Sequence, residues 1–453
     1  MKPRLSEQLT LFASIVKWSA YASVVGALAG SGTALFLKTL AKGTTIAAAA
    51  PDYQFFLPLF LLASSALVRY LAPGAAGHGT EKVIEAVHQH MGYIPFRVVP
   101  VKLVATVVTL ASGGSAGKEG PCAQIGAGLA SVFASVIRLP EAERKKLVIC
   151  GISAGFATVF GTPIAGALFG IEVLVLGQVM YDVLLPSFVA GIVGYHVATS
   201  LGITYYHDSI SIVSGMTGRG FLEMLLLGVW CGLVALLFIQ LLHVMHSQLG
   251  RLFRHWIASA LIGGVLLVLI GRFVSWNYLG LGLGTIETGL RGEHLPAGAL
   301  FWKSITTAIT LGCGGSGGVL TPVFFVGTAA GNLFAFLFHE PNVAAFSAIG
   351  MVAVLAAAAN TPISASVMAM EMFGSNIGPH AAVACVVSFL IVGYHSVYPS
   401  QLLGIQKSDS LLAPAGSQLG EIEHAVVTPR EKSLLAALIA VWQRVKPPKG
   451  PET

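Results

Sequence analysis

An internal repeat with a period of about 200 residues constrains this chain more than any other feature. Lys102–Gly117 reads KLVATVVTLASGGSAG, and Lys303–Gly318, 201 positions later, reads KSITTAITLGCGGSGG. Thr162–Glu172 (TPIAGALFGIE) matches Thr361–Glu371 (TPISASVMAME) at a spacing of 199 positions. Two matching blocks in the same order and at nearly the same spacing predict that the chain consists of two homologous halves.

The repeat divides the chain into four parts. We expect an N-terminal segment at 1–16, a first membrane repeat at 17–205, a second membrane repeat at 216–406 and a C-terminal tail at 407–453. The tail is short and polar, then weakly amphipathic at about 430–446, and it is too short to hold an added regulatory domain. The first residues, MKPRLSEQLT, lack the pattern of a cleavable signal.

Composition indicates what surrounds the two halves. Only 10% of the residues are charged, whereas a soluble domain carries about 25%. Apolar residues make up 55%, and the mean hydropathy is +0.78. A soluble fold of this length needs more charge to cover its surface, so lipid must cover much of this one. The net charge of +6 raises nucleic-acid binding as an alternative, but no basic patch interleaves with aromatic residues, so we expect none.

The apolar runs predict helices that start or stop within the bilayer. Several runs are shorter than the roughly 20 residues that a full span needs, and glycine-rich stretches interrupt them at 113–120 and 312–318. Irregular backbone at that depth is tolerated inside protein or beside a watery cavity. Repeats in transporters commonly have inverted topology, with the substrate site between them. The predicted fold class is therefore an all-α polytopic transmembrane fold, with two inverted-topology repeats of tilted and broken helices.

Basic residues cluster near both ends of the chain. By the positive-inside rule, both termini are expected in the cytoplasm of a multi-pass inner (plasma) membrane protein. These residues are Lys2, Arg4, Lys17, Arg430, Lys432, Arg444, Lys446 and Lys449. The five cysteines lack CxxC or CxxH spacing and lie in apolar or glycine-rich segments, so they are expected to be buried structural thiols rather than metal ligands or disulfides.

Three glycine-rich turns are the candidate site. Residues 77–81 read GHGTE, residues 117–121 read GKEGP and residues 318–322 read GVLTP, and each is expected to open an apolar helix. The start of a helix carries free N–H groups and a partial positive charge, both of which favour anions. Three such helix starts that converge would hold a dehydrated anion without a full positive charge to trap it.

These motifs resemble the CLC family of chloride channels and proton-coupled transporters, over about residues 20–406. GKEGP looks like the family's G(K/R)EGP motif, GVLTP is similar to GxFxP, and GHGTE occupies the place of GSGIP. Tyr398, in HSVYPSQLL, matches the family's pore tyrosine. The resemblance implies chloride or a similar small anion as substrate, protons as a possible second substrate, one pore per subunit, a homodimer and no cofactor.

The resemblance also implies roles for individual residues. Glu119 would be the gate, whose carboxylate competes with the anion until protonation releases it. The alternative is a carboxylate that only caps a helix start. The backbone N–H groups of Val319 and Leu320, with the Tyr398 hydroxyl, would line a central anion site, and the backbone of Lys118–Gly120 an outer site. Taken without the resemblance, Tyr398 could equally be an interfacial aromatic anchor.

Two positions depart from the family pattern. His78, beside Gly79 in the first turn, stands where the family has its pore serine; it could bind the anion, point away, or be a neutral core histidine. Val173 stands where coupled transporters of the family usually carry their internal proton-accepting glutamate. Channels of the family also lack that acid, but so do some bacterial antiporters. Glu172 and Glu371 recur in both halves, and we expect them to cap or pair within the fold.

Several functions therefore stay open. They are a proton-coupled chloride antiporter, a passive channel or uncoupled transporter, and a fluoride carrier, because a divergent bacterial branch of the family exports fluoride and alters the first motif. A remote alternative from another class is an intramembrane serine hydrolase, since GxSxG patterns surround Ser115, Ser153 and Ser316. Three copies in helical, glycine-rich surroundings are more typical of small-residue packing, so no enzyme activity is expected.

Overall fold

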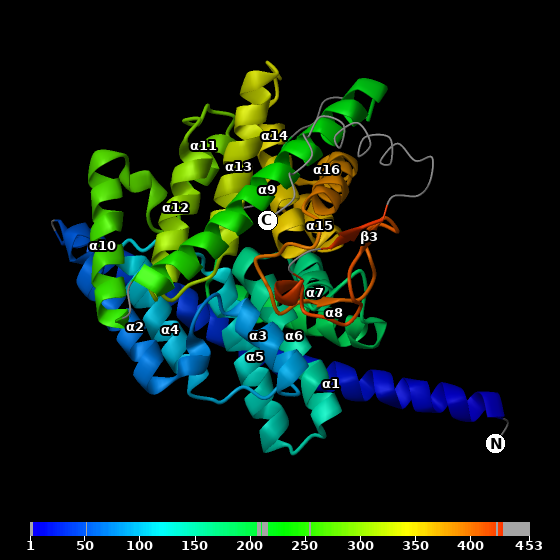
Figure 1. The fold of residues 1–453 in the computed structure, drawn as a ribbon. Helices are drawn as coiled ribbons and strands as arrows, with labels where there is room; N and C mark the ends of the chain where they lie inside the picture. The colour runs from blue at the N-terminus through cyan, green and yellow to red at the C-terminus, as the bar shows by residue number, and fades with distance from the viewer. Residues whose placement is uncertain are drawn as a thin grey trace, which may run out of the picture.

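The computed structural model describes residues 3–50, 52–205, 210, 216–252, 255–422 and 425–428. Lys2, the amphipathic stretch at 430–446 and the basic residues within and after it lie outside the described residues. Within those residues the chain forms sixteen α-helices and very little strand (Figure 1). The all-α prediction is therefore confirmed.

The helices fall into two sets of eight along the described chain. The first set is α1 (Pro3–Ala49), α2 (Leu57–Leu71), α3 (Thr80–Gln89), α4 (Val98–Ala111), α5 (Glu119–Val136), α6 (Glu141–Phe160), α7 (Pro163–Glu172) and α8 (Leu184–Ser200). The second set is α9 (Gly218–Leu252), α10 (Trp256–Phe273), α11 (Leu283–Leu290), α12 (Ala299–Gly312), α13 (Leu320–Leu337), α14 (Val343–Ala359), α15 (Pro362–Phe373) and α16 (Gly378–Ile391). Each helix of the first set has a counterpart in the second, so the sequence repeat is also a repeat of helix order.

Local sequence explains where the short helices begin and end. A Thr-Pro pair precedes the body of α7 and of α15, and proline at the first helical position costs no hydrogen bond. The preceding helices, α6 and α14, are each followed by a capping residue, Gly161 and Asn360, in the left-handed backbone conformation. With 10 and 12 residues, α7 and α15 are too short to span a bilayer of about 20 residues. The prediction of short, broken helices is thus confirmed.

Reciprocal hydrogen bonds join the two halves at these short helices. The Glu172 carboxylate, at the end of α7, accepts the N–H groups of the second and third residues of α15 at 2.9 and 2.8 Å. The Glu371 carboxylate, on α15, accepts the N–H groups of the second and third residues of α7 at 3.0 and 2.7 Å. Both glutamates therefore cap helices, as expected, and each caps the helix of the opposite half.

Replacing Glu172 or Glu371 by glutamine is expected to destabilise the fold by about 1–2 kcal/mol, because the helix start loses one acceptor oxygen and the adjacent negative charge. Thermal unfolding in detergent, followed by tryptophan fluorescence, measures the loss as a lower Tm. Exposed Glu287, which faces Arg291 at 3.8 Å on α11, supplies the control Glu287→Gln. Equal Tm values for all three variants would contradict the capping role.

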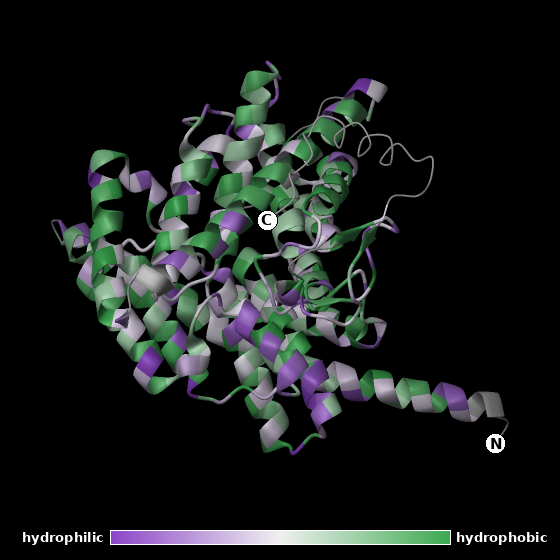
Figure 2. Ribbon diagram, in the orientation of Figure 1, coloured by the Kyte–Doolittle hydropathy of each residue, from purple (hydrophilic) through white to green (hydrophobic). Residues whose placement is uncertain are grey.

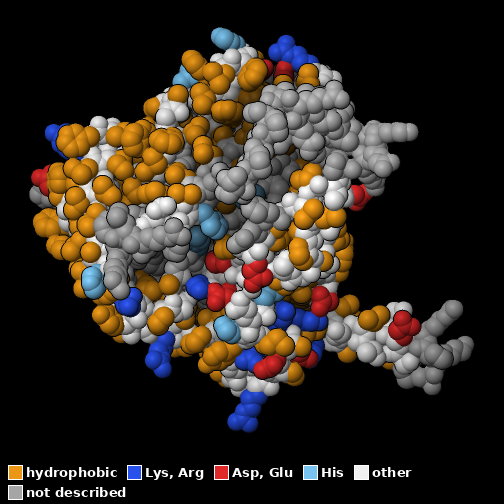
Figure 3. All heavy atoms as spheres, in the orientation of Figure 1, with side chains coloured by type: hydrophobic (Ala, Val, Ile, Leu, Met, Phe, Trp, Pro, Cys, Tyr) orange, Lys and Arg blue, Asp and Glu red, His pale blue; other side chains and the backbone are white. Residues whose placement is uncertain are grey.

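The surface is suited to lipid. Six of the described helices are long and apolar enough to cross a membrane: Ser6–Ala49, Tyr53–Leu71, Tyr181–Ser200, Gly218–Met245, Trp256–Phe273 and Leu320–Leu337. Hydrophobic residues dominate α9 and α10, whereas hydrophilic residues gather around α3 (Figure 2). The same division is seen on the surface, where apolar side chains cover broad areas over α10 and charged side chains gather lower down (Figure 3).

The segment after α16 folds back onto the helices. Short strands β1 (Val175–Leu176) and β2 (Leu402–Leu403) pair in parallel, and β3 (Leu411–Leu412) pairs antiparallel with β4 (Val426–Val427). Buried Leu419 packs with Tyr394 and Leu403 in a small separate core. The first part of the polar tail therefore holds the preceding segment in place. Single 3₁₀ turns complete the described secondary structure at Tyr53–Phe56, Pro73–Ala75, Tyr181–Val183, Trp276–Tyr278, Ser375–Ile377 and Leu419–Glu421.

Candidate functional site

Two of the glycine-rich turns are directly hydrogen-bonded to each other. Gly117 and Gly318 exchange both backbone bonds, each with an N–O distance of 2.7 Å, although they are 201 positions apart. Helix α5 begins two residues after the first glycine, and α13 begins two residues after the second. The starts of two equivalent helices thus lie side by side at the junction of the halves, and their first N–H groups have no acceptor within their own helix.

The third turn packs against the same point. Gly79 has a φ of +77°, which favours glycine, and a Cβ there would lie 2.5 Å from the carbonyl oxygen of Gly120. A Cβ on Gly120 would in turn collide with the carbonyl oxygen of His78. The predicted convergence of the three turns is therefore confirmed. The expectation that all three open apolar helices is wrong for α3, whose sequence TEKVIEAVHQ is amphipathic.

Glu119 lies at this junction with its side chain fully buried. Its Oε2 accepts the backbone N–H of Thr321 at 3.0 Å, and its Oε1 accepts the Thr321 hydroxyl at 2.5 Å. The carboxylate is the first residue of α5 but binds the start of α13, in the opposite half. It does not cap its own helix, and it occupies a position where a helix start offers its N–H group to an anion.

Tyr398 also lies in the interior. Its side chain is fully buried, which is inconsistent with an interfacial anchor. Its hydroxyl faces that of Thr80, on α3, and neither has another hydrogen-bond partner among the described residues. The segment is held in place, because Gln401 donates from Nε2 to the carbonyl oxygens of Val173 and Ala359 at 2.8 Å each. Two buried hydroxyls with no partner besides each other form a polar lining that can donate to a ligand.

The remaining predicted anion-binding residues lie around the same junction. Val319 and Leu320 are buried at the start of α13, where Leu320 is the first helical residue. Lys118 precedes α5 and is partly exposed. Thr321, the partner of Glu119, was not predicted, although it is part of the GVLTP motif; the sequence did not show that this turn would face Glu119.

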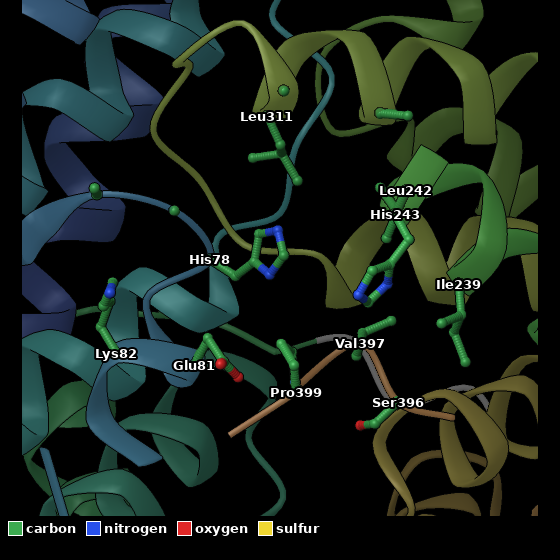
Figure 4. Close-up of a pocket in the computed structure, with 14 residues that line it drawn as sticks. His78, Glu81, Lys82, Ile239, Leu242, His243, Leu311, Ser396, Val397 and Pro399 are labelled. Atoms are coloured by element: carbon green, nitrogen blue, oxygen red, sulfur yellow. The ribbon is translucent and has the colours of Figure 1, made fainter. Parts of the chain in front are cut away.

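His78 borders a cavity of about 240 Å³ between α3, α9, α12 and the segment that carries Tyr398. The rings of His78 and His243 project into this cavity from opposite walls, and Glu81 lies below His78 (Figure 4). Glu81 and His243 were missed by sequence analysis. The available signal was an acidic side chain inside the GHGTE motif, at the start of a helix that borders the predicted pore.

Two buried lysines hold the turns from behind. Lys102 is fully buried and donates to the carbonyl oxygens of Ala75 and Gly77 at 3.1 and 2.7 Å. Its counterpart in the repeat, Lys303, donates to the carbonyl oxygens of Tyr278 and Gly280 at 3.3 and 2.8 Å. The lysine that both copies of the repeated block share thus fixes the chain just before α3 in one half and before α11 in the other.

The GxSxG serines are engaged in packing within the described residues. The Ser115 hydroxyl lies 3.0 Å from the Thr307 hydroxyl, and the Ser316 hydroxyl lies 3.0 Å from that of Thr106. Ser153 donates to the carbonyl oxygen of Ala167 on a neighbouring helix. None of these hydrogen bonds involves a histidine or a lysine, which are the bases that activate a nucleophilic serine. The pattern fits the expected small-residue packing.

Comparisons with known proteins agree with this geometry. A family model described as "Voltage gated chloride channel" matches residues 59–393. A "Chloride/fluoride channel protein" of Pseudomonas syringae pv. tomato is 37% identical over 415 residues, which cover 90% of this chain and 91% of the relative. A solved "CLC-type fluoride/proton antiporter" is 29% identical and superposes with a TM-score of 0.81, covering 85% of this chain and 98% of the other. A "slow cyanobacterial Cl-/H+ antiporter", at 20% identity and a TM-score of 0.72, covers 83% of this chain and 94% of its own and shares the fold.

Proposed function

The chain belongs to the voltage-gated chloride channel (CLC) family, and from that premise we propose that it exchanges a small anion, chloride or fluoride, for protons through a pore gated by Glu119. It is a multi-pass membrane transport protein with a CLC-type fold. Transport of small anions is the activity of its family, and its relatives are named for chloride and fluoride.

The contact between Glu119 and Thr321 is the observation that carries the proposed gate. A carboxylate that accepts the N–H and hydroxyl of Thr321 lies at the start of α13, directly beside the N–H groups of Val319 and Leu320 that we propose for the halide. The two anions therefore exclude each other. Protonation removes the charge of Glu119, weakens its hydrogen bonds with these donors and opens the position to the transported anion. The start of α13 then binds either the ionised Glu119 carboxylate or a halide, and this alternation is the basis of exchange.

The transported anion is proposed to rest on two sets of donors. The backbone N–H groups of Val319 and Leu320, with the buried hydroxyl of Tyr398, supply a central site. The backbone of Lys118–Gly120 supplies an outer site next to the Glu119 carboxylate. His78 and Gly79 border the central site through the third turn, and the His78 ring faces the cavity. Backbone donors bind a halide without the full positive charge that would hold it too tightly.

Coupling to protons is favoured over passive conduction by one comparison. The structural neighbour at 29% identity is named as a fluoride/proton antiporter. Val173 argues for the passive alternative, since it is fully buried and cannot carry a proton. We give more weight to the neighbour, because a buried carboxylate at the anion position provides the element that coupling needs.

The arrangement in the membrane completes the proposal. The halves 17–205 and 216–406 are proposed to be inverted relative to each other, as repeats in transporters commonly are. Their reciprocal caps fit a two-fold axis between the halves. Both termini are proposed to lie in the cytoplasm, and two copies are proposed to form a homodimer with one pore each, resting on apolar lipid-facing surface.

Flux through proteoliposomes tests the proposal. We expect an imposed chloride or fluoride gradient to drive protons against their own gradient, and the anion that drives more protons is the substrate. A pH electrode follows the protons and an ion-selective electrode follows the anion. Protein-free liposomes are the control. If the reversal potential follows the anion alone across a pH gradient, the protein is a passive channel and the coupling proposal is wrong.

A further inference from the structure

A buried gate exchanges protons with an aqueous cavity through the groups that lie between them. Glu119 is fully buried, so a proton that arrives from the cavity must cross protein to reach it. Val173 cannot carry that proton. The neighbouring Glu172 accepts hydrogen bonds from the start of α15 with both of its carboxylate oxygens. A titratable group that serves this step would therefore lie elsewhere.

Glu81 has the geometry of such a group. It is the second residue of α3 and lines the cavity of about 240 Å³ (Figure 4). Its Oε1 accepts the Ser400 N–H at 3.0 Å and the Ser400 hydroxyl at 2.5 Å. Its Oε2 is buried and has no hydrogen-bond partner among the described residues. One oxygen thus anchors the carboxylate, and the other remains available to bind a proton.

The cavity gives this carboxylate a way to solvent. It adjoins a second cavity of about 270 Å³, and both are lined by Ile239, His243, Ser396 and Pro399. The second cavity reaches the returning tail at Leu419. His243 stands at the junction of the two cavities and its side chain is exposed, so the path from Glu81 leads outward past an imidazole.

On its other side Glu81 adjoins the pore lining. It follows Thr80, whose hydroxyl faces that of Tyr398, and neither hydroxyl has another partner among the described residues. Its anchor, Ser400, is two positions from Tyr398. Glu81 and Glu119 both lie close enough to the Tyr398 phenol to act on it electrostatically. Thr80 and Tyr398 therefore lie near both carboxylates, that of Glu81 and that of Glu119.

Glu81 is the acidic residue among those that line this cavity. On its own helix, Lys82 pairs with Glu85 at 2.7 Å. The preceding turn contributes His78 and α9 contributes His243. The wall from α12 is apolar, and the segment at 396–400 contributes Ser396 and Ser400 but no charge.

We infer that Glu81 is the inner proton acceptor of this transporter, in place of the acid that position 173 lacks. The inference rests on the proposed proton coupling. Glu81 Oε2 takes a proton from hydronium in the cavity, becomes neutral, and passes the proton by way of the Thr80 and Tyr398 hydroxyls to the Glu119 carboxylate. Glu81 is then ionised again and Glu119 is neutral, so Glu119 releases Thr321 and the anion can enter.

Paired flux measurements on Glu81→Gln test this. We expect anion flux to persist and anion-driven proton movement to fall to that of protein-free liposomes. Glu81→Asp, which restores an acid, should recover proton movement. Glu85→Gln, on the same helix, is the matched control and should keep both fluxes. If Glu81→Gln moves protons in the same ratio to the anion as wild type, the inference is wrong while the proposed function stands.

Flux measurements on the wild-type protein distinguish a failure of the proposed proton coupling from a failure of the Glu81 inference. If wild type moves no protons, the coupling proposal and this inference fall together. If Glu81→Gln does not fold, Ser400→Ala decides the question, because it removes one hydrogen bond from the carboxylate and leaves the acid in place. We expect its proton flux to show a shifted dependence on cavity-side pH. An unshifted profile overturns the role of Glu81.

Discussion

Glu119→Gln is expected to abolish proton transport and to flatten the pH dependence of anion flux, while the anion flux itself persists. Glutamine is always neutral, so it cannot alternate between competing for the Thr321 N–H and releasing it. The pore then stays accessible to the anion at every pH. Anion efflux from proteoliposomes at a series of pH values, with proton uptake recorded in parallel, measures the change.

The matched control is Glu172→Gln, which neutralises another buried carboxylate of the first half. Glu172 caps α15 and does not contact Thr321, so this variant should lower the Tm and leave the pH dependence of flux intact. A Glu119→Gln protein whose flux still varies with pH as in wild type would disprove the gate assignment, whichever anion is transported.

Gly120→Ala is expected to cause the largest loss of folded protein among single substitutions at the site. The added methyl group would collide with the carbonyl oxygen of His78, and its other close neighbour is the Cα of Gly318. Both obstacles are backbone atoms of the other two turns, which cannot rotate away as a side chain does. Overpacking costs typically about 1–3 kcal/mol, and backbone obstacles place this variant at or above the upper end. Thermal unfolding in detergent and anion flux should both show the defect.

Gly284→Ala provides the comparison. Gly284 lies on the exposed side of α11, and a Cβ there meets no atom within 4 Å. Alanine should leave flux unchanged and stabilise the helix by roughly 0.5–1 kcal/mol, since glycine is the weaker helix former. Equal Tm values for the two variants would show that the three turns are less closely packed than the structure indicates.

The architecture and the centre of the site could be predicted because both depend on short stretches of sequence. The repeated blocks predicted two related halves, and the glycine-rich turns predicted helix starts that meet. Glu119 could be singled out because a charged residue in an apolar, glycine-rich segment has few structural explanations. Glu172 and Glu371 could be interpreted as caps because they end the same repeated block.

The partners of these residues could not be predicted, because they depend on which surfaces meet in space. Nothing in the motif GVLTP indicates that Thr321 binds Glu119, 202 positions earlier. The role of Glu81 depends on Ser400, 319 positions away, and on a cavity that α9 closes. The tail was predicted as a polar extension, yet Leu419 packs against the segment that positions Tyr398, since a few apolar side chains in a polar stretch give no periodic signal.

The exchanged helix caps bear on how the chain is made. The N–H group of Ile164 is bound by a carboxylate that is synthesised 207 residues later. During insertion, the N–H groups at the start of α7 therefore have no carboxylate to bind until α15 has been synthesised. The corresponding helix of the second half finds Glu172 already in place. The two caps are therefore reciprocal in the folded protein but form at different times, because the cap of α7 needs a residue of α15.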